Sequence, residues 1–564
     1  MTRSTYRYAL IALVFTLFGT LLGTQFHTAL SPDDAVEQFK KMKEAFLLIS
    51  GKYVHQVRAK RIAEGGVAGM LDRLDPHSSY IPPEEVTRQR DRIRGTFGGV
   101  GIRYDILNDT AQVVSPIEGG PSEEAGVMTG DRIVEIADST AIGLSEQGIR
   151  NRLTGRKGTE VTFTVYRPLS DERLTFTISR GEIPLYSIHS SYMMDDRTGY
   201  LEIGRFAKST PDEFVRSVNE LKQKGMERLV IDLRGNTGGA LQSAVQVADE
   251  MLGTPGQTIV SMKGRTARAR QTWRTQAGGI LASAPVTLLV DGNTASASEI
   301  LAGALQDHDR ALLVGRRTFG KGLVQEPFSL NDGSILNLTI GAYYTPVGRF
   351  IQTPYEEGEQ KAYYQKKIAN RRDAIYHVRE YRERIPDSLT YRTKHGRTVF
   401  GGGGILPDYV VQPDTASLSG FLQRRELDRI FAFFAGEWFS KHGQQLRNNW
   451  QDRSDTFLSR YAVPEAAIDA FWTYAENKDV LTLATPPDAA NPDRQIYPHA
   501  AADSSREIVQ AHITGQLANV LFGDGHGQPA LNRVDPTVQK ALSLWSSSRK
   551  LAEYHTAERE RGDE

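Results

Sequence analysis

Three hydroxyl side chains, Thr294, Ser296 and Ser298, stand at alternate positions in the stretch DGNTASASEILAGALQD, residues 291–307. They come just before an apolar run with helical spacing, where a hydroxyl can cap a helix, bind a phosphate or attack a carbonyl carbon. Ser296 is followed three residues later by Glu299, which is the spacing of a capping box. A helix start also offers unpaired N–H groups that stabilise a developing oxyanion. The stretch alone leaves both capping and nucleophilic catalysis open.

A serine that attacks a carbonyl needs a group that accepts its proton. His308 is the nearest histidine, but it lies about 18 Å along the expected helix from Ser296 at 1.5 Å per residue. Lys321, in RRTFGKGLVQ, is another candidate, since burial among uncharged neighbours favours the neutral form of a lysine. Gln325 lies four residues further on, on the same face of a helix or a strand, where its oxygen can hold the amine. A more distant histidine, or a lysine that merely occupies a glycine turn, remains an alternative.

Composition and spacing exclude several other classes of site. The chain has no cysteine, which rules out disulfides, thiolate catalysis and Cys-ligated zinc. Lys+Arg and Asp+Glu both number 68, so the overall charge gives no reason to expect a nucleic-acid partner. GRRTFGKG (315–322) resembles a phosphate loop, but Gly322 stands where that loop has Ser or Thr, and a strand-like run follows. We therefore expect no nucleotide, metal or cofactor.

Apolar strands that alternate with helices are expected to position these residues. RLVIDLR (228–234) precedes GNTGG and a helix, APVTLLVDG (284–292) precedes the serine stretch, and ALLVGR (311–316) follows it. This alternation predicts a parallel sheet covered by helices. Ligands bind at the carboxyl ends of the strands in such sheets, and both the glycine turn and the serine stretch fall there.

The rest of the chain divides into segments of different texture. Arg3 and Arg7 precede an apolar run, which predicts an export signal or a membrane anchor in residues 1–30 and a protein that works in the periplasm or cell envelope. The other expected segments are a helical part (31–94), a mostly β module (95–182), an α/β core (183–415) with a charged, solvated helical insertion (355–397), and a helical C-terminal region (416–564).

Seven segments, taken in order, resemble the C-terminal processing peptidases, or tail-specific proteases, which are serine endopeptidases with a Ser-Lys dyad. They cover about residues 35–412 and read LDPHSSY (74–80), GTFGGVGI (95–102), GGPSEEAGVMTGDRIVEI (119–136), IDLRGNTGGAL (231–241), NTASASEILAGALQD (293–307), GRRTFGKGLVQ (315–325) and AYYTPVGRFIQ (342–352). The resemblance implies a crotonase/ClpP-like α/β protease core with an inserted PDZ domain, an N-terminal helical segment and a helical C-terminal region.

The same resemblance assigns roles to individual residues. Ser296 would be the nucleophile, Lys321 the general base and Gln325 the residue that orients the lysine. The N–H groups of Gly239 and Ala297 would form the oxyanion hole. The alternatives are a noncatalytic PDZ scaffold, which has no need of an intact dyad, and an acyl-CoA enzyme, which has no need of a PDZ domain.

A PDZ domain implies that substrates are bound by their C-terminal tails. Successive N–H groups of the glycine-rich stretch can point at one carboxylate. The expected tail-binding residues are Gly98, Gly99, Val100 and Gly101 around the carboxylate, with Ile102, Ile149 and Leu153 around the last side chain. The expected partners are thus protein substrates and, through residues 1–30, a membrane, with a homo-oligomer or an adaptor left open.

Overall fold

The structure is a computed structural model of the 564-residue chain. It describes residues 35–107, 109–117, 119–168, 170–276, 279–415, 417–451, 453–484 and 496–562. The expected signal or anchor in residues 1–30 lies outside them. The chain divides into two units, Met1–Tyr80 and Ile81–Glu564, which are described separately. The first contains helices α2 (Ala35–Lys52) and α3 (Ala59–Leu71), and no helix in the described part of the chain is both long and apolar enough to cross a membrane.

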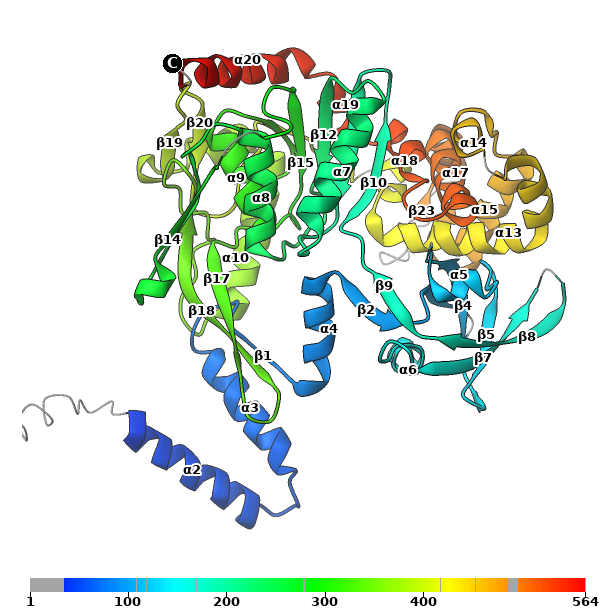
Figure 1. The fold of residues 1–564 in the computed structure, drawn as a ribbon, viewed down its shortest axis with the longest axis horizontal. Coiled ribbons are helices and arrows are strands. Elements are labelled where there is room, and N and C mark those ends of the chain that lie inside the picture. Colours follow the sequence, from blue (N-terminus) through cyan, green and yellow to red (C-terminus); the bar gives the residue numbers. More distant parts are fainter. Residues whose placement is uncertain are drawn as a thin grey trace, which may run out of the picture. The chain divides into compact units, whose positions relative to one another are not determined.

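A six-stranded sheet forms the centre of the second unit (Figure 1). Its strands, in spatial order, are β10 (Ile188–Met193), β11 (Thr198–Ile203), β12 (Arg228–Asp232), β15 (Val286–Val290), β16 (Leu312–Gly315) and β21 (Tyr409–Val410). The pairs from β11 to β21 are parallel, and β10 runs antiparallel to β11. The predicted parallel sheet is confirmed, with one antiparallel strand at its edge.

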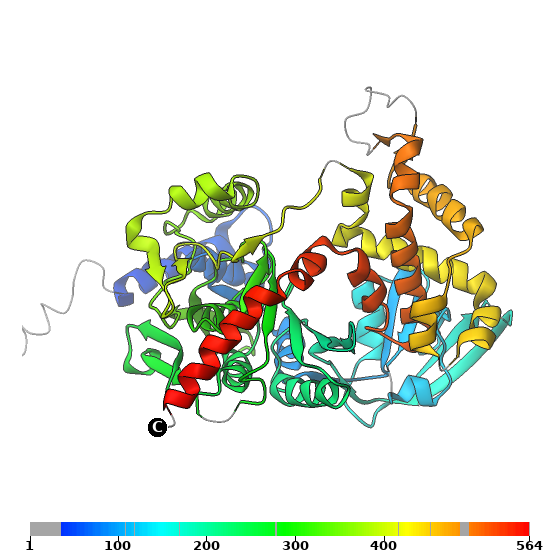
Figure 2. The same cartoon turned by 90° about the horizontal axis from the view of Figure 1, so that it is seen from above.

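Helices cover both faces of this sheet because successive side chains of a buried parallel strand point to opposite faces. Leu229 and Ile231 of β12 pack into the core shared with α7 (Thr210–Gln223), α8 (Leu241–Leu252) and α9 (Ala297–Asp307). Val230, between them, packs with Val538 and Trp545 on the opposite face. That face is covered by α19 (Pro536–Leu542) and α20 (Trp545–Gly562), which crosses the sheet in Figure 2.

The β module is a sheet in the order β3-β4-β5-β7-β8, with β3 at its edge. Its elements are β2 (Thr96–Gly99), β3 (Ile102–Leu107), β4 (Thr110–Pro116), α5 (Pro121–Glu124), β5 (Arg132–Ile136), β6 (Ser139–Thr140), α6 (Glu146–Leu153), β7 (Glu160–Arg167), β8 (Glu172–Ser179) and β9 (Gly181–Pro184). Since β2 pairs with β9, the chain enters and leaves the module at one place, as an inserted domain requires.

An antiparallel group of strands is built from two segments of the chain, one before α9 and one after it. It pairs β13 (Thr258–Gly264) with β14 (Gln271–Arg274) and with β18 (Ile335–Tyr344), which also pairs with β17 (Leu323–Ser329). The charged insertion forms α10 (Gln360–Tyr376) and α11 (Val378–Glu383). The sequence predicted a fully solvated insertion, and this was wrong for one face of α10. Tyr363, Lys367 and Ala374 are buried there.

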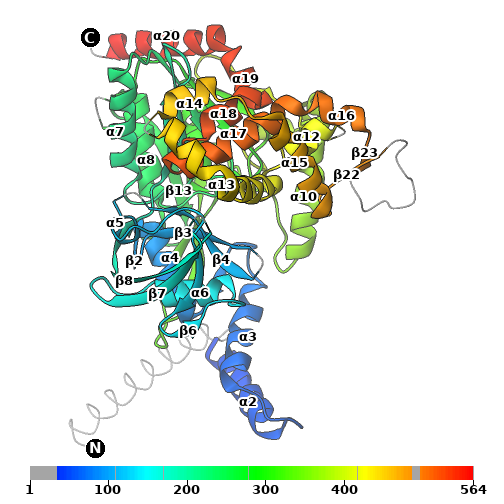
Figure 3. The same cartoon turned by 90° about the vertical axis from the view of Figure 1, so that its right-hand side faces the viewer.

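The C-terminal region has a separate aromatic-rich core, and its helices gather in one group in Figure 3. They are α12 (Leu418–Leu422), α13 (Asp428–Trp450), α14 (Ser454–Arg460), α15 (Glu465–Asn477), α16 (His499–Ser504), α17 (Arg506–Phe522) and α18 (Gln528–Val534). The expected region 416–564 is therefore divided, since α19 and α20 belong to the α/β core.

Candidate functional site

Ser296 is the N-cap residue of α9, at the carboxyl end of β15. Its backbone has φ 57° and ψ −117°, a conformation that few residues other than glycine adopt. Such strain persists only where the surroundings impose it, and it concentrates at functional sites. The capping box is formed, since Glu299 accepts the N–H of Ser296 at 2.9 Å. The capping role is therefore real, and it is compatible with a nucleophile at the same position.

The carboxylate of Glu299 joins the helix of Ser296 to the loop that carries Lys321. It is fully buried and accepts four hydrogen bonds, from the N–H groups of Ser296 (2.9 Å), Gly320 (2.7 Å) and Lys321 (2.9 Å) and from the hydroxyl of Thr318 (2.5 Å). Burial raises the pKa of Glu299, and its donors oppose that shift. The main chains of Ser296 and Lys321 are thus held by one carboxylate oxygen.

The hydroxyl of Tyr343 connects the same two residues on their carbonyl side. It lies 2.6 Å from the carbonyl oxygen of Lys321 and 3.1 Å from that of Ser296. Tyr343 is 1% exposed, and burial holds its pKa well above the usual range, so the phenol remains a neutral donor. The main chains of Ser296 and Lys321 are thus linked by two side chains that the sequence had not identified for this purpose, and the dyad of their side chains stays a prediction.

The glycine turn after β12 lies against the start of α9. Gly238 has φ 99°, and a Cβ there would lie 2.9 Å from the Cβ of Ser296, so only glycine fits. Gly239 forms an isolated bridge with Phe206. Within the described residues, the N–H groups of Gly239 and Ala297 have no hydrogen-bond partner. Both predicted oxyanion donors are therefore available to a ligand.

Gln325 lies in β17, next to a register shift between Val324 and Gln325. Its side-chain amide donates to the hydroxyl of Thr339 on the neighbouring strand at 3.0 Å. This bond fixes the side chain close to the loop of Lys321, and its role in orienting the lysine stays a prediction.

Helix α10 of the insertion contributes residues that the sequence analysis missed. The ammonium of Lys367 lies 2.8 Å from the centroid of the Phe319 ring and 3.1 Å from the hydroxyl of Tyr363. That hydroxyl also accepts from Gln352 (3.4 Å), whose oxygen accepts the N–H of Gly322 (2.9 Å). The insertion therefore supports the Lys321 loop on both sides of the lysine. The signal in the sequence was the i, i+4 spacing of Tyr363 and Lys367 in a helix otherwise rich in charge.

Lys367 has an unusual electrostatic environment. Burial lowers its pKa to about 7; Glu299 opposes this shift, whereas Arg371, Arg317 and Lys321 add to it. Lys367 and Lys321 thus interact as like charges around one buried carboxylate.

The predicted tail-binding residues lie at the entrance of the β module. Gly98 and Gly99 end β2, Val100 is buried, and Gly101 turns the chain with φ 78°. Ile149 and Leu153 of α6 are 0% and 3% exposed and pack in the module's core, with Ile102 packed against them. Ile149 and Leu153 are thus part of the module's core, and the role of all three residues in binding a substrate tail stays a prediction.

Among the described residues, no group of three or more His, Asp or Glu side chains is arranged to hold a metal ion.

Comparisons with known proteins cover both the α/β core and the β module. The profile of Peptidase family S41 matches residues 197–357, that of a PDZ domain residues 98–179, and that of the activating protease CtpB N-terminal domain residues 23–85. A carboxy-terminal-processing protease of Bartonella bacilliformis is 34% identical over 61% of this chain and 79% of its own length. Carboxy-terminal processing protease CtpB of Bacillus subtilis is 33% identical over 57% of this chain and 68% of its own length.

Among solved structures, a photosystem II D1 C-terminal processing protease aligns with 28% sequence identity and a TM-score of 0.32. The alignment covers 55% of this chain and 83% of that one.

Proposed function

The chain belongs to the carboxy-terminal processing proteases of peptidase family S41, and we propose that Ser296 and Lys321 form the catalytic dyad of this serine protease. The observation that carries the assignment is the pair of bridges, Glu299 and Tyr343, which each contact the main chains of both residues. The two bridges hold the main chains of Ser296 and Lys321 next to each other, which is the placement that a dyad of their side chains requires.

In the proposed reaction, the Oγ atom of Ser296 attacks the scissile carbonyl carbon while its proton passes to the neutral amine of Lys321. The N–H groups of Gly239 and Ala297 stabilise the oxyanion of the tetrahedral intermediate. The C–N bond then breaks, and the leaving amine takes the proton from Lys321. Water hydrolyses the acyl-enzyme with Lys321 again as the base, which returns Ser296 to its starting state.

The alternative base, His308, is occupied elsewhere. It lies at the C-terminal end of α9, and its Nε2 atom is 2.7 Å from the carbonyl oxygen of Thr258. Because Ser296 is at the other end of this helix, His308 is out of reach of the nucleophile.

The dyad is tested by cleavage of an unfolded polypeptide. Ser296→Ala removes the nucleophile, and Lys321→Arg replaces the base by a guanidinium that stays protonated. We expect both variants to lose at least about a thousandfold in kcat/KM while their melting temperatures stay close to that of the native protein. Ser298→Ala is the matched control and should remain active. Near-normal turnover of Lys321→Arg would exclude the dyad and return the histidine alternative.

We further propose that the PDZ domain selects substrates by their free C-terminal carboxylate. The support is the glycine-rich turn Gly98–Gly101 beside β3, an edge strand to which a peptide can add. A hydrogen bond to a charged group contributes about 1.5–3 kcal/mol, so amidating the tail should lower kcat/KM about ten- to a hundredfold. One polypeptide with free and amidated ends should be compared well below saturation. Equal rates would show that the domain does not select tails.

Residues 1–30 are proposed to export the enzyme to the periplasm or cell envelope, or to tether it to the membrane there. The support is Arg3 and Arg7 ahead of an apolar run. Fractionating cells that express the full chain, and cells that express a chain without these residues, tests this. The full chain should be extracytoplasmic and the truncated one cytoplasmic, whereas identical cytoplasmic fractions would contradict the proposal.

A further inference from the structure

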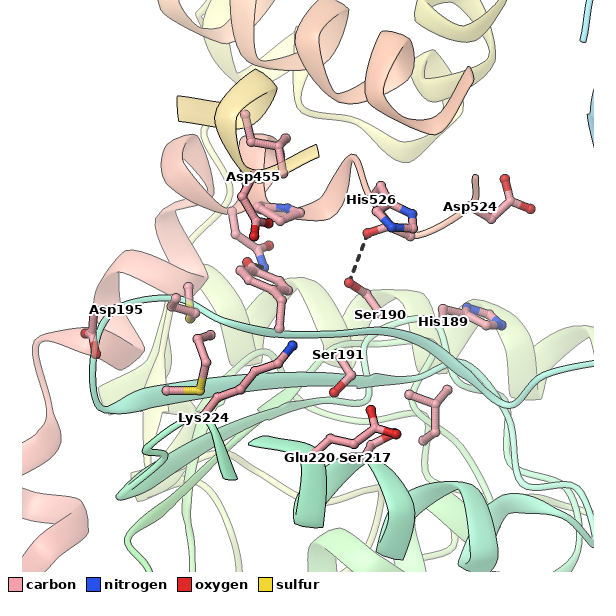
Figure 4. Close-up of a pocket in the computed structure, with 18 of the residues that line it drawn as sticks. His189, Ser190, Ser191, Asp195, Ser217, Glu220, Lys224, Asp455, Asp524 and His526 are labelled. Carbon is pink, nitrogen blue, oxygen red and sulfur yellow. Dashed lines mark hydrogen bonds between the residues drawn. The ribbon is translucent and has the colours of Figure 1, made fainter. Parts of the chain in front are cut away.

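A cavity of about 770 Å³ lies along the outer edge of the core sheet, beside β10 (Figure 4). Strand β10 runs between α7 on one side and the C-terminal helices on the other. Ser217 and Glu220 of α7 and Lys224 directly after it line the first wall, and Asp455 and His526 line the second. We call this cavity the edge groove.

The edge of β10, rather than one of its faces, forms the floor of the groove. Successive side chains of a strand point to opposite faces, so a single face would contribute only every second residue. Here every residue from Ile188 to Asp195 lines the cavity. In Figure 4, Ser190 points to the C-terminal helices, where it donates to the carbonyl of Gly525 at 3.1 Å, and Ser191 points towards α7.

The hydrogen-bond pattern of the β10–β11 pair shows which main-chain groups face the groove. The N–H of Met194 donates to the carbonyl of Thr198 at 2.7 Å, and Met193 is paired with Gly199 in the register. Bonded and non-bonded pairs alternate along an antiparallel ladder, so Met193 and Ser191 direct their N–H and C=O groups outwards.

These outward groups have no partner in the part of the chain that the structure describes. No backbone hydrogen bond reaches the N–H or C=O of Ser191 or Met193 from outside the β10–β11 pair, and no strand pairs with the outer edge of β10. An open edge of this kind is a template for another extended chain.

We infer that the edge groove binds an extended segment of the polypeptide substrate, which adds to β10 as a further strand. Ser191 and Met193, whose main-chain groups point outwards, are two residues apart. A second extended chain hydrogen-bonds through every second residue, so its spacing matches theirs. The walls carry both charges, Lys224 against Glu220 and Asp455, so neither a nucleic acid nor an anionic lipid surface is complementary to them. Substrates of a processing protease are polypeptides, and main-chain pairing binds them whatever their side chains are.

The groove is also continuous with the two sites proposed above, on which this inference rests. Ile188, at the start of β10, is paired with Ile203 at the carboxyl end of β11, the end of the sheet that carries the oxyanion turn. Asp524, at the groove's other wall, forms an ion pair of 2.6 Å with Arg103 on the edge strand of the PDZ domain. The end of the groove at Ile188 and Asp524 is therefore next to both proposed sites, and a bound segment can continue from there along β10.

Ser191→Pro tests the inference, because proline removes only an N–H that points away from β11 and leaves the native ladder paired. Losing one such hydrogen bond should raise KM for a long unfolded polypeptide about two- to tenfold, with kcat and the melting temperature unchanged. Ser191→Ala keeps the N–H and should have the KM of the native enzyme. On a peptide too short to reach the groove, Ser191→Pro should also have the native KM. An unchanged KM for the long polypeptide would overturn the inference.

A second measurement does not depend on proline being tolerated, nor on the dyad assignment. The chain has no cysteine, so Ser191→Cys in the Ser296→Ala protein gives one attachment point for a thiol-reactive benzophenone. Irradiation should capture the polypeptide substrate there, but not at Ser546→Cys, an exposed position on α20. Capture of a second copy of the chain instead, or no capture, would contradict substrate binding in the groove. Failure of the dyad would appear separately, as cleavage by Ser296→Ala.

Discussion

The side chain of Glu299 aligns the proposed dyad, because it binds the main chains of both Ser296 and Lys321. Its two oxygens accept from donors on both sides of the site, and three of the four donors are main-chain N–H groups. Those N–H groups cannot turn away, so the carboxylate fixes the backbone at both positions of the proposed dyad. The buried charge has a cost, visible in the raised pKa of Glu299, which the four hydrogen bonds offset.

Glu299→Gln should therefore inactivate the enzyme without changing either member of the dyad. In glutamine an amide nitrogen replaces one of the two carboxylate oxygens. This nitrogen is a donor, so it cannot accept the two hydrogen bonds that the replaced oxygen accepts in the native protein. Each buried donor left unsatisfied costs about 1–3 kcal/mol, so we expect a loss of 10- to 100-fold or more in kcat and a lower urea midpoint.

Ser298→Ala is the control at this scale. Ser298 is equally buried and donates to the carbonyl of Asn236 at 3.1 Å, but it has no contact with the Lys321 loop. It should lose about 1 kcal/mol of stability, the net contribution of one neutral hydrogen bond, and keep its turnover. Normal kcat in Glu299→Gln would show that the bridge is structural only.

At the scale of elements, the insertion helix α10 belongs to the surroundings of the dyad. Lys367, Arg371 and Arg317 place positive charge next to Lys321 and Glu299. A like charge disfavours the protonated form of its neighbour, so a charged Lys367 promotes the neutral form of Lys321, which the proposed dyad requires.

Lys367→Met should move the acidic limb of the pH profile of kcat/KM to higher pH. Because burial lowers the pKa of Lys367 to about 7, its charge is present below that pH and lost above it. We expect up to about a tenfold lower rate than the native enzyme near pH 6.5, and equal rates well above pH 7, where Lys367 is neutral in the native enzyme and its removal takes away no charge. Lys366→Met, at the exposed neighbouring position, should leave the profile unchanged. A uniform loss at every pH would indicate a packing role instead.

At the scale of the whole molecule, the helical C-terminal region contains a buried titratable side chain. The core of the C-terminal helices contains His512, which is 6% exposed and stacks on Phe431 with ring centroids 4.3 Å apart. Burial lowers the pKa of His512 to about 4, so the ring is neutral in the folded protein at pH 6. Asp428 lies 3.9 Å from its Nδ1 atom, too far for a hydrogen bond that would hold the proton there.

Acid should therefore weaken the C-terminal helices first. Between pH 6.5 and 4 the unfolded state binds a proton at this histidine that the folded state does not, so stability falls as the pH is lowered through this range, by up to about 3 kcal/mol. His512→Phe should remove this part of the pH dependence of the urea midpoint. His499→Phe, at an exposed position, should keep it. The same acid response in His512→Phe and the native protein would contradict this account.

Local patterns in the sequence were sufficient to predict the central α/β architecture. Period-two and apolar runs such as 228–234 and 284–292 predict parallel strands because a strand buried on both faces needs apolar residues throughout. The glycine turn and the serine stretch follow those strands directly, so topology places them at one edge of the sheet. Ser296 could be nominated as a cap or a nucleophile for that reason, whereas Gly239 and Ala297 were assigned through the resemblance to a known family.

Only the tertiary structure decided what holds Lys321 against Ser296. Glu299 is a capping residue in the sequence, and its bonds to Gly320 and Lys321 join segments about twenty residues apart. The buried face of α10 and the open edge of β10 are likewise invisible in the sequence. Which face of a charged helix is buried depends on the elements that pack against it, and whether a strand lies at an edge depends on the order of strands in the sheet.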